Sequence, residues 1–241
     1  MSKYLLTIGI PNYNYAEYLI DLLNCLLKQK TSSVEILVSD NCSNDNSWEI
    51  ISSFETNGYN IFKQEENLGM ISNWNFLLER AQGEFFMILP ADDIIADNFI
   101  KQIIYHINLI ETENYSTIIW GYENDIFGRN QRIKMLPSDY SIPESFLPKE
   151  DPDSFFNSIH FSPPWCHIQK TEMMKNNGCY HDNSRRPDTR LFLDVIHESN
   201  SLEILCINEC LSAQRIHNRN ERKNSFSNLM VIDNLIIDKI S

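Results

Sequence analysis

The sequence predicts an α/β fold in which helices cover both faces of a mostly parallel sheet. Short apolar runs alternate with amphipathic segments through the first hundred residues, and short connections join them. Continuously apolar runs of this kind are typical of strands that are buried on both faces. The length agrees, because 241 residues suffice for one large domain with its own core.

The predicted elements follow one another in a regular order. Strands are expected at residues 4–11, 34–40, 59–62 and 83–90, and a later one at 116–125. Amphipathic helices are expected at residues 16–28, 48–54, 71–81 and 99–110. Asp97 is predicted to cap the last of these helices.

The second half of the chain is less periodic. Residues 129–153 contain four prolines and are predicted to form a long loop. Residues 225–241 have apolar side chains at roughly helical spacing, so a C-terminal helix is expected there. That helix could pack on the body of the protein, on a second copy in a homodimer, or on a membrane surface.

Composition restricts the class of protein. The net charge of −13 argues against a nucleic-acid partner, because phosphate backbones are held mainly by Lys and Arg. No apolar run approaches the ~20 residues that span a bilayer, and no signal-peptide pattern opens the chain, so we expect a cytoplasmic protein. The six cysteines are scattered, which predicts reduced and mostly buried thiols.

Polar residues follow three of the predicted strands. Residues 11–14, 40–41 and 92–93 all fall where a parallel strand ends, and ligands of such sheets bind at the carboxyl ends of the strands. We therefore expect the three clusters to meet. Asp92 and Asp93 are adjacent carboxylates after a buried run, so they need solvent, a cation or hydrogen-bond donors nearby.

Three ordered segments resemble the family 2 glycosyltransferases of GT-A fold. They read "TIGIPNYNYAEYL", "EILVSDNCSNDNSWEII" and "ENLGMISNWNFLLERAQGEFFMILPADD", and weaker likeness continues in "RRPDTRLFLDVI" and "LSAQRIH". The resemblance implies a metal-dependent, inverting glycosyltransferase of polysaccharide biosynthesis. Its donor would be a nucleotide-sugar, with a UDP-sugar favoured, and its acceptor a hydroxyl of a glycan or lipid-linked saccharide. The family also suggests a peripheral place at the inner face of the membrane.

The resemblance divides the chain and assigns roles to residues. It implies a nucleotide-sugar-binding half at 1–115, an acceptor-binding and catalytic half of the same domain at 116–224, and the C-terminal helix at 225–241. The implied donor-binding residues are Pro11, Tyr13, Asn14, Asp40, Asn67, Asn75, Asp92 and Arg215. An alternative for Asp40 is that it and Asn41 cap the turn into the next helix.

The implied metal site contains Asp92, Asp93 and His217, and the cofactor would be Mn²⁺ or Mg²⁺. Such cations take one or two protein carboxylates and complete their shell with substrate phosphates and water. Asp188 is implied to be the catalytic base, although it also suits the N-cap of a helix. His217 could instead be an ordinary surface or core histidine.

The sequence departs from the family pattern at three positions. Pro90 stands where the family often has the first Asp of its acidic motif, Trp74 where many members have Arg, and Pro187 where an acidic residue usually precedes the base. These departures keep a second hypothesis open, in which the protein binds nucleotide-sugars without transferring them. A nucleotidyltransferase is less consistent, because no glycine-rich, basic phosphate loop is present.

Overall fold

The computed structural model describes residues 3–110, 117–126, 129–132, 167–181, 191, 194–195 and 205–216. Asp188, His217 and the predicted helix at 225–241 lie outside these residues, and so does the boundary at 115. In the described part of the chain, no helix combines the length and apolar character needed to cross a bilayer.

Four parallel strands form the N-terminal half of the sheet, as the sequence predicts. Their order is β3-β2-β1-β4, with bounds β1 (Tyr4–Asn12), β2 (Val34–Asp40), β3 (Asn60–Lys63) and β4 (Gly83–Ile88). The expected helices are present as α1 (Ala16–Gln29), α2 (Ser47–Ser52), α3 (Met70–Arg80) and α4 (Phe99–Ile110). The helix predicted at 48–54 ends early, and a 3₁₀ turn, η1 (Glu55–Asn57), follows it.

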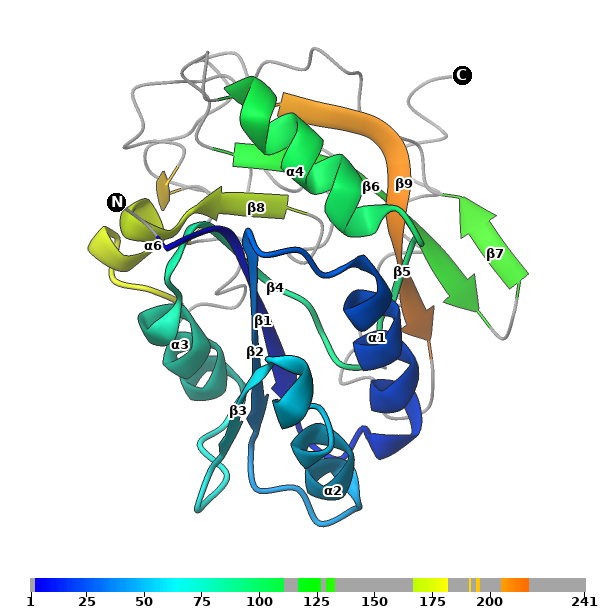
Figure 1. The fold of residues 1–241 in the computed structure, drawn as a ribbon, viewed down its shortest axis with the longest axis vertical. Coiled ribbons are helices and arrows are strands. Elements are labelled where there is room, and N and C mark those ends of the chain that lie inside the picture. The colour runs from blue at the N-terminus through cyan, green and yellow to red at the C-terminus, as the bar shows by residue number, and fades with distance from the viewer. Residues whose placement is uncertain are drawn as a thin grey trace, which may run out of the picture.

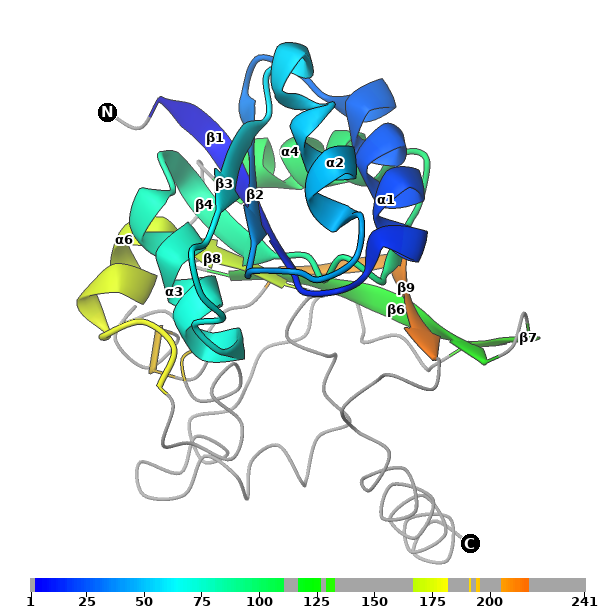
Figure 2. The ribbon, with the colours of Figure 1, turned by 90° about the horizontal axis from the view of Figure 1, so that it is seen from below.

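Helices cover both faces of the sheet. Figure 2 shows α1, α2 and α4 on one face, with α3 and the short helix α6 (Thr171–Asn176) on the other. Strand residues alternate between the two sides, so Ile8 and Ile10 of β1 join one core cluster while Phe86 and Ile88 of β4 join the other. The predicted fold class is therefore confirmed.

The second half of the chain extends the same sheet with mixed strand directions. The order continues from β4 through β8 (His167–Lys170), β6 (Thr117–Ile126) and β9 (Leu205–Ile216) to β5 (Ile94–Ile95). Strand β8 is antiparallel to both β4 and β6, while β9 runs parallel to β6 and antiparallel to β5. Figure 1 shows β9 curving alongside β6. One sheet thus joins both halves of the chain.

One sequence prediction of this half is corrected. The loop expected at 129–153 begins with a strand, β7 (Arg129–Arg132), which pairs antiparallel with β6. Strands β8 and β9 and helix α6 were also not predicted. The pairing partners of the two strands lie far away in the chain, so local periodicity gave no indication of them. Helix α6 is only six residues long.

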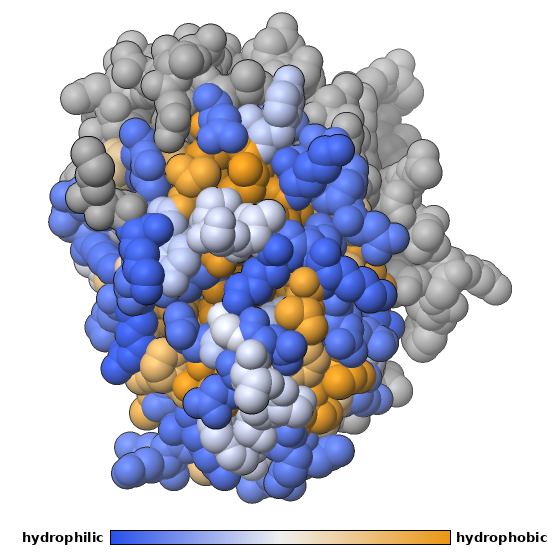
Figure 3. All heavy atoms as spheres, viewed as in Figure 1, coloured by the Kyte–Doolittle hydropathy of each residue, from blue (hydrophilic) through white to orange (hydrophobic). Residues whose placement is uncertain are grey.

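The described part of the face drawn in Figure 3 is mostly polar. Figure 3 shows hydrophilic side chains over most of the described part of one face, with hydrophobic patches between them. Large hydrophobic side chains that remain exposed include Tyr13 after β1, Met70 at the start of α3, and Tyr105 on α4.

Candidate functional site

The ends of the first three parallel strands are joined directly. Asn12 at the end of β1 lies opposite Asp40 at the end of β2, and the Asn41 amide donates to the Asn12 carbonyl over 2.9 Å. The Gln64 amide, just after β3, donates to the Asp40 carbonyl over 2.9 Å. The first two predicted polar clusters therefore meet at the carboxyl edge of the sheet.

The Asp40 carboxylate is completely buried and accepts three hydrogen bonds. Asn12 Nδ2 and Ser43 Oγ donate to Oδ1 over 2.9 and 2.5 Å, and the Ser43 amide donates to Oδ2 over 3.3 Å. These donors explain how a carboxylate is tolerated without solvent. They also fit the turn-capping alternative for Asp40, whereas its contact with a nucleotide base stays a prediction.

Further hydrogen bonds tie the loop after β1 to the loop after β2. The Asn14 amide donates to Ser43 Oγ over 2.9 Å, and Asn14 Oδ1 accepts from the Asn44 amide over 2.7 Å. Asp45 accepts from the first amide of α1, at Ala16, over 3.0 Å. Burial favours a higher pKa for Asp45, but hydrogen bonds from Ser47 and Ala16 outweigh burial and lower that pKa.

Two other predicted residues lie beside this pair of loops. Pro11 is half-buried within β1, opposite Ser39 of β2. Tyr13 follows with 41% of its surface exposed, so its ring is accessible at the carboxyl edge of the sheet. This position is compatible with the predicted edge of a nucleoside pocket.

Asn41, which was predicted as part of a polar strand-end cluster and as a possible turn cap but not as a donor-binding residue, holds the loop that leads into α3. Its Nδ2 donates to Asn67 Oδ1 over 2.9 Å and to the Gly69 carbonyl over 3.3 Å, while its Oδ1 accepts from the Leu68 amide over 2.9 Å. Asn67 Oδ1 also accepts from the Gly69 amide over 2.9 Å. Gly69 has φ +81°, a conformation that favours glycine. Asn67, which was predicted to bind the nucleotide-sugar, thus stabilises the loop in which it lies.

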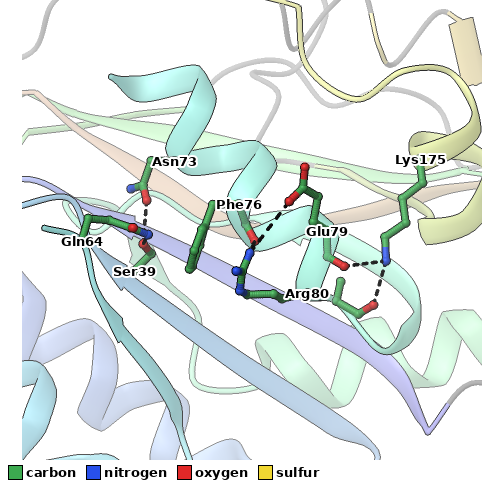
Figure 4. Close-up of polar contacts among 8 residues, drawn as sticks. Ser39, Gln64, Asn73, Phe76, Glu79, Arg80 and Lys175 are labelled. Atoms are coloured by element: carbon green, nitrogen blue, oxygen red, sulfur yellow. Dashed lines mark hydrogen bonds and ion pairs between the residues drawn. The ribbon is translucent and has the colours of Figure 1, made fainter. Parts of the chain in front are cut away.

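Helix α3 is anchored at both ends by side chains from other elements. Gln64 donates to Ser39, which donates to Asn73 over 2.6 Å, and Figure 4 shows this chain of contacts at one end of the helix. At the other end, Lys175 Nζ donates to the carbonyls of Glu79 and Ala81, each over 3.1 Å. A lysine at the C-terminus of a helix also complements the helix dipole.

Asn75, another predicted donor residue, binds the protein backbone. Its Nδ2 donates to the Tyr180 carbonyl and its Oδ1 accepts from the Tyr180 amide, both over 2.8 Å. The neighbouring Trp74 is buried with an edge-to-face contact to the Tyr180 ring, at 5.2 Å between centroids. The tryptophan that replaces the family's arginine is therefore part of the core.

The acidic turn follows β4, which lies beside β1. The Asp93 amide donates to the Pro90 carbonyl over 3.2 Å, and the residues Asp92 and Asp93 are only 8% and 4% exposed. The chain then forms β5, whose pairing with β9 brings Arg215 to the turn. Arg215 Nε donates to the Asp92 carbonyl over 3.2 Å, across 123 residues of sequence.

The acidic turn suits a hard divalent cation by the chemistry of its donor atoms. Asp92 and Asp93 supply carboxylate oxygens, which Mg²⁺ and Mn²⁺ prefer, and such ions need few ligands from the protein. Among the described residues, no group of three or more His, Cys, Asp or Glu could enclose a metal ion. A site here would therefore need phosphate or water ligands, or residues outside the described ranges such as His217.

Comparison with known proteins relates the chain to glycosyltransferases. Residues 7–178 match the family model described as glycosyl transferase family 2. The glycosyltransferase GlyG of Streptococcus pneumoniae serotype 4 is 28% identical over 191 residues, which cover 76% of this chain and 62% of GlyG. The poly(ribitol-phosphate) β-N-acetylglucosaminyltransferase TarS of Staphylococcus aureus (strain Mu50) is 26% identical over 180 residues, covering 72% of this chain and 29% of TarS. The chain thus spans less than two thirds of either relative.

Solved structures with the same fold include two glycosyltransferases. Residues 1–349 of S. aureus TarS in complex with UDP-GlcNAc superpose with a TM-score of 0.70 at 19% identity, covering 91% of this chain and 61% of that one. The mannosyltransferase PcManGT of Pyrobaculum calidifontis, in complex with GDP-Man and Mn²⁺, gives 0.63 at 15% identity, with coverages of 89% and 58%. At these identities the likeness concerns the fold alone.

Proposed function

This chain belongs to glycosyl transferase family 2, and we propose that it transfers a sugar from a nucleotide-sugar to a hydroxyl of a glycan or lipid-linked saccharide. The observation that carries the proposal is the meeting of polar loops at the carboxyl edge of the parallel strands. There hydrogen bonds join the loops after β1 and β2, and Arg215 donates a hydrogen bond to the acidic turn after β4. Ligands of such sheets bind at this edge.

A UDP-sugar is the proposed donor. The support is that TarS, which shares the fold and is a sequence relative, forms a complex with UDP-GlcNAc. Pro11, Tyr13, Asn14 and Asp40 would border the nucleoside, with the exposed Tyr13 ring available to stack on it. Asn67 and Asn75 would act on the donor through the backbone segments they hold.

The diphosphate is proposed to lie at the acidic turn. Asp92 and Asp93, with His217, would hold Mn²⁺ or Mg²⁺, and the bound ion would neutralise charge on the departing nucleoside diphosphate. Arg215 would add a guanidinium, a group that pairs well with phosphate oxygens. Asp92 is thus proposed to help hold the divalent ion through its carboxylate, while its backbone carbonyl fixes Arg215.

Asp188 is proposed as the catalytic base of an inverting transfer. An inverting reaction requires a carboxylate that takes the proton of the acceptor hydroxyl on the side opposite to the leaving group. The acceptor would be a saccharide or lipid-linked saccharide of polysaccharide biosynthesis, for which TarS, named for transfer to poly(ribitol-phosphate), gives support by likeness. We place the reaction in the cytoplasm, at the inner face of the membrane, where a lipid-linked acceptor would be presented.

The test is donor turnover with matched variants. The protein is incubated with MnCl₂, with UDP-, GDP-, dTDP- or CMP-sugars and with saccharide acceptors, and release of the free nucleotide is measured alongside binding by calorimetry. Asp92→Asn should weaken binding, and Asp188→Asn should abolish turnover while binding persists. Glu49→Gln, at an exposed carboxylate of α2, is the control.

Two results would contradict the proposal. Binding without turnover on any acceptor, unaffected by Asp188→Asn, would support the alternative of a nucleotide-sugar-binding protein without transferase activity. Absence of both binding and turnover with all four donor classes would reject a donor site at this edge of the sheet.

A further inference from the structure

The guanidinium of an arginine on β9 lies over the ring of a tyrosine on α1, beside the acidic turn. The Arg215 Cζ lies 4.9 Å from the centroid of the Tyr18 ring. The same guanidinium donates from Nε to the Asp92 carbonyl over 3.2 Å. Tyr18 itself is half-buried and lies 6.1 Å from the Tyr15 ring, centroid to centroid. Three segments that are distant in sequence are thus joined through one guanidinium.

The contact between Arg215 and Tyr18 lies beside buried, negatively charged residues. Asp92 and Asp93 are almost fully buried, so water screens the negative charges of their carboxylates poorly. The anionic diphosphate of a nucleotide-sugar would be repelled by such a turn unless positive charge lay beside it. Arg215 is positive charge that the chain itself brings to the turn.

An arginine side chain has many rotamers, so more than one contact is needed to hold its guanidinium in a single orientation. The Nε hydrogen bond to Asp92 constrains one point of the plane, and an aromatic face constrains the plane itself. Tyr18 lies on α1, and buried leucines such as Leu19 and Leu22 hold that helix against the core. The Tyr18 ring therefore offers the Arg215 guanidinium an aromatic face that belongs to a well-packed helix.

We propose that Tyr18 is a positioning residue of the donor site, which seats the Arg215 guanidinium beside the acidic turn so that it meets the donor diphosphate. This inference rests on the proposed function, because it concerns the same site. Tyr18 acts through Arg215, so its effect should fall on donor affinity and should depend on the presence of Arg215.

The test measures binding of UDP in the presence of MnCl₂ by calorimetry, using the full chain. Tyr18→Leu removes the ring and should weaken UDP binding about two- to fivefold, the range expected for one partly exposed cation–π contact. Tyr18→Phe keeps the ring face and should restore affinity. Arg215→Lys keeps the charge without the planar guanidinium and should resemble Tyr18→Leu. Tyr105→Leu, at an exposed tyrosine of α4, is the matched control.

A double-mutant cycle separates positioning from a general structural role. In an Arg215→Met background, Tyr18→Leu should cause no further loss of UDP affinity, because the seated group is gone. Steady-state kinetics should show a raised donor KM with kcat retained. If the unsubstituted protein binds UDP but Tyr18→Leu binds equally well, or if its effect persists in the Arg215→Met background, the positioning inference is wrong. If the unsubstituted protein does not bind UDP, the proposed donor fails instead.

Discussion

Asn75 offers the sharpest choice between a ligand contact and a structural contact. The family resemblance places it at the donor, whereas both polar atoms of its amide bind the Tyr180 backbone over 2.8 Å. Asn75→Ala would remove both hydrogen bonds and leave the amide and carbonyl of Tyr180, a residue only 6% exposed, without these partners. We therefore expect this substitution to destabilise the fold.

The expected size of the effect follows from the two bonds. A net contribution of about 1 kcal/mol for each bond, with part of the desolvation cost of the abandoned backbone groups, gives a loss of roughly 2–4 kcal/mol. For a domain of this size, that corresponds to a decrease in Tm of roughly 4–8 °C. Thermal and urea unfolding followed by circular dichroism measure both quantities. Asn24→Ala, at an exposed asparagine of α1, is the control.

A second substitution at the same position adds a pH test. Asn75→Asp keeps an acceptor for the Tyr180 amide but places a carboxylate oxygen against the Tyr180 carbonyl. The resulting repulsion raises the pKa of the introduced carboxyl in the folded state. Protonation restores a donor, so the deficit relative to the unsubstituted protein should shrink as pH falls towards 4. If Asn75→Ala unfolds like the unsubstituted protein and yet loses UDP binding tenfold, the structural reasoning is refuted.

Three further outcomes are expected. Burial lowers the pKa of His167 to about 3, so below pH 6.5 the unfolded state takes up a proton that the folded state does not. Stability should therefore fall by about 2 kcal/mol between pH 6.5 and 5, and urea titrations should show a shallower pH slope for His167→Gln. Gly83→Ala would place a Cβ 2.5 Å from the Thr7 amide nitrogen, so a loss of about 3 kcal/mol or more is expected in the same assay, and unchanged stability would contradict that packing. Asn41→Ala should speed hydrogen exchange of the Leu68 amide severalfold, and an unchanged exchange rate would show that the side chain does not hold this loop.

Local pattern was sufficient for the N-terminal parallel strands and the helices between them. In each amphipathic segment, leucines and isoleucines recur at the period of a helix, and this spacing indicates which face of the helix is buried. The acidic turn could also be predicted, since two carboxylates directly after an apolar run need solvent, a cation or hydrogen-bond donors nearby. The residue pattern thus predicted where a site would form along the edge of the sheet.

Contacts across long sequence separations were decided by the tertiary structure alone. Asn75 reaches Tyr180 across 105 residues, and Arg215 reaches Asp92 across 123. Strands β8 and β9 exist because β4, β6 and β5 offer them backbone partners, and no periodicity within a strand names its neighbour. The sequence by itself determined which residues are polar at the strand ends. Only folding determined which of them bind one another, because hydrogen bonds depend on distance and direction in space and not on position along the chain.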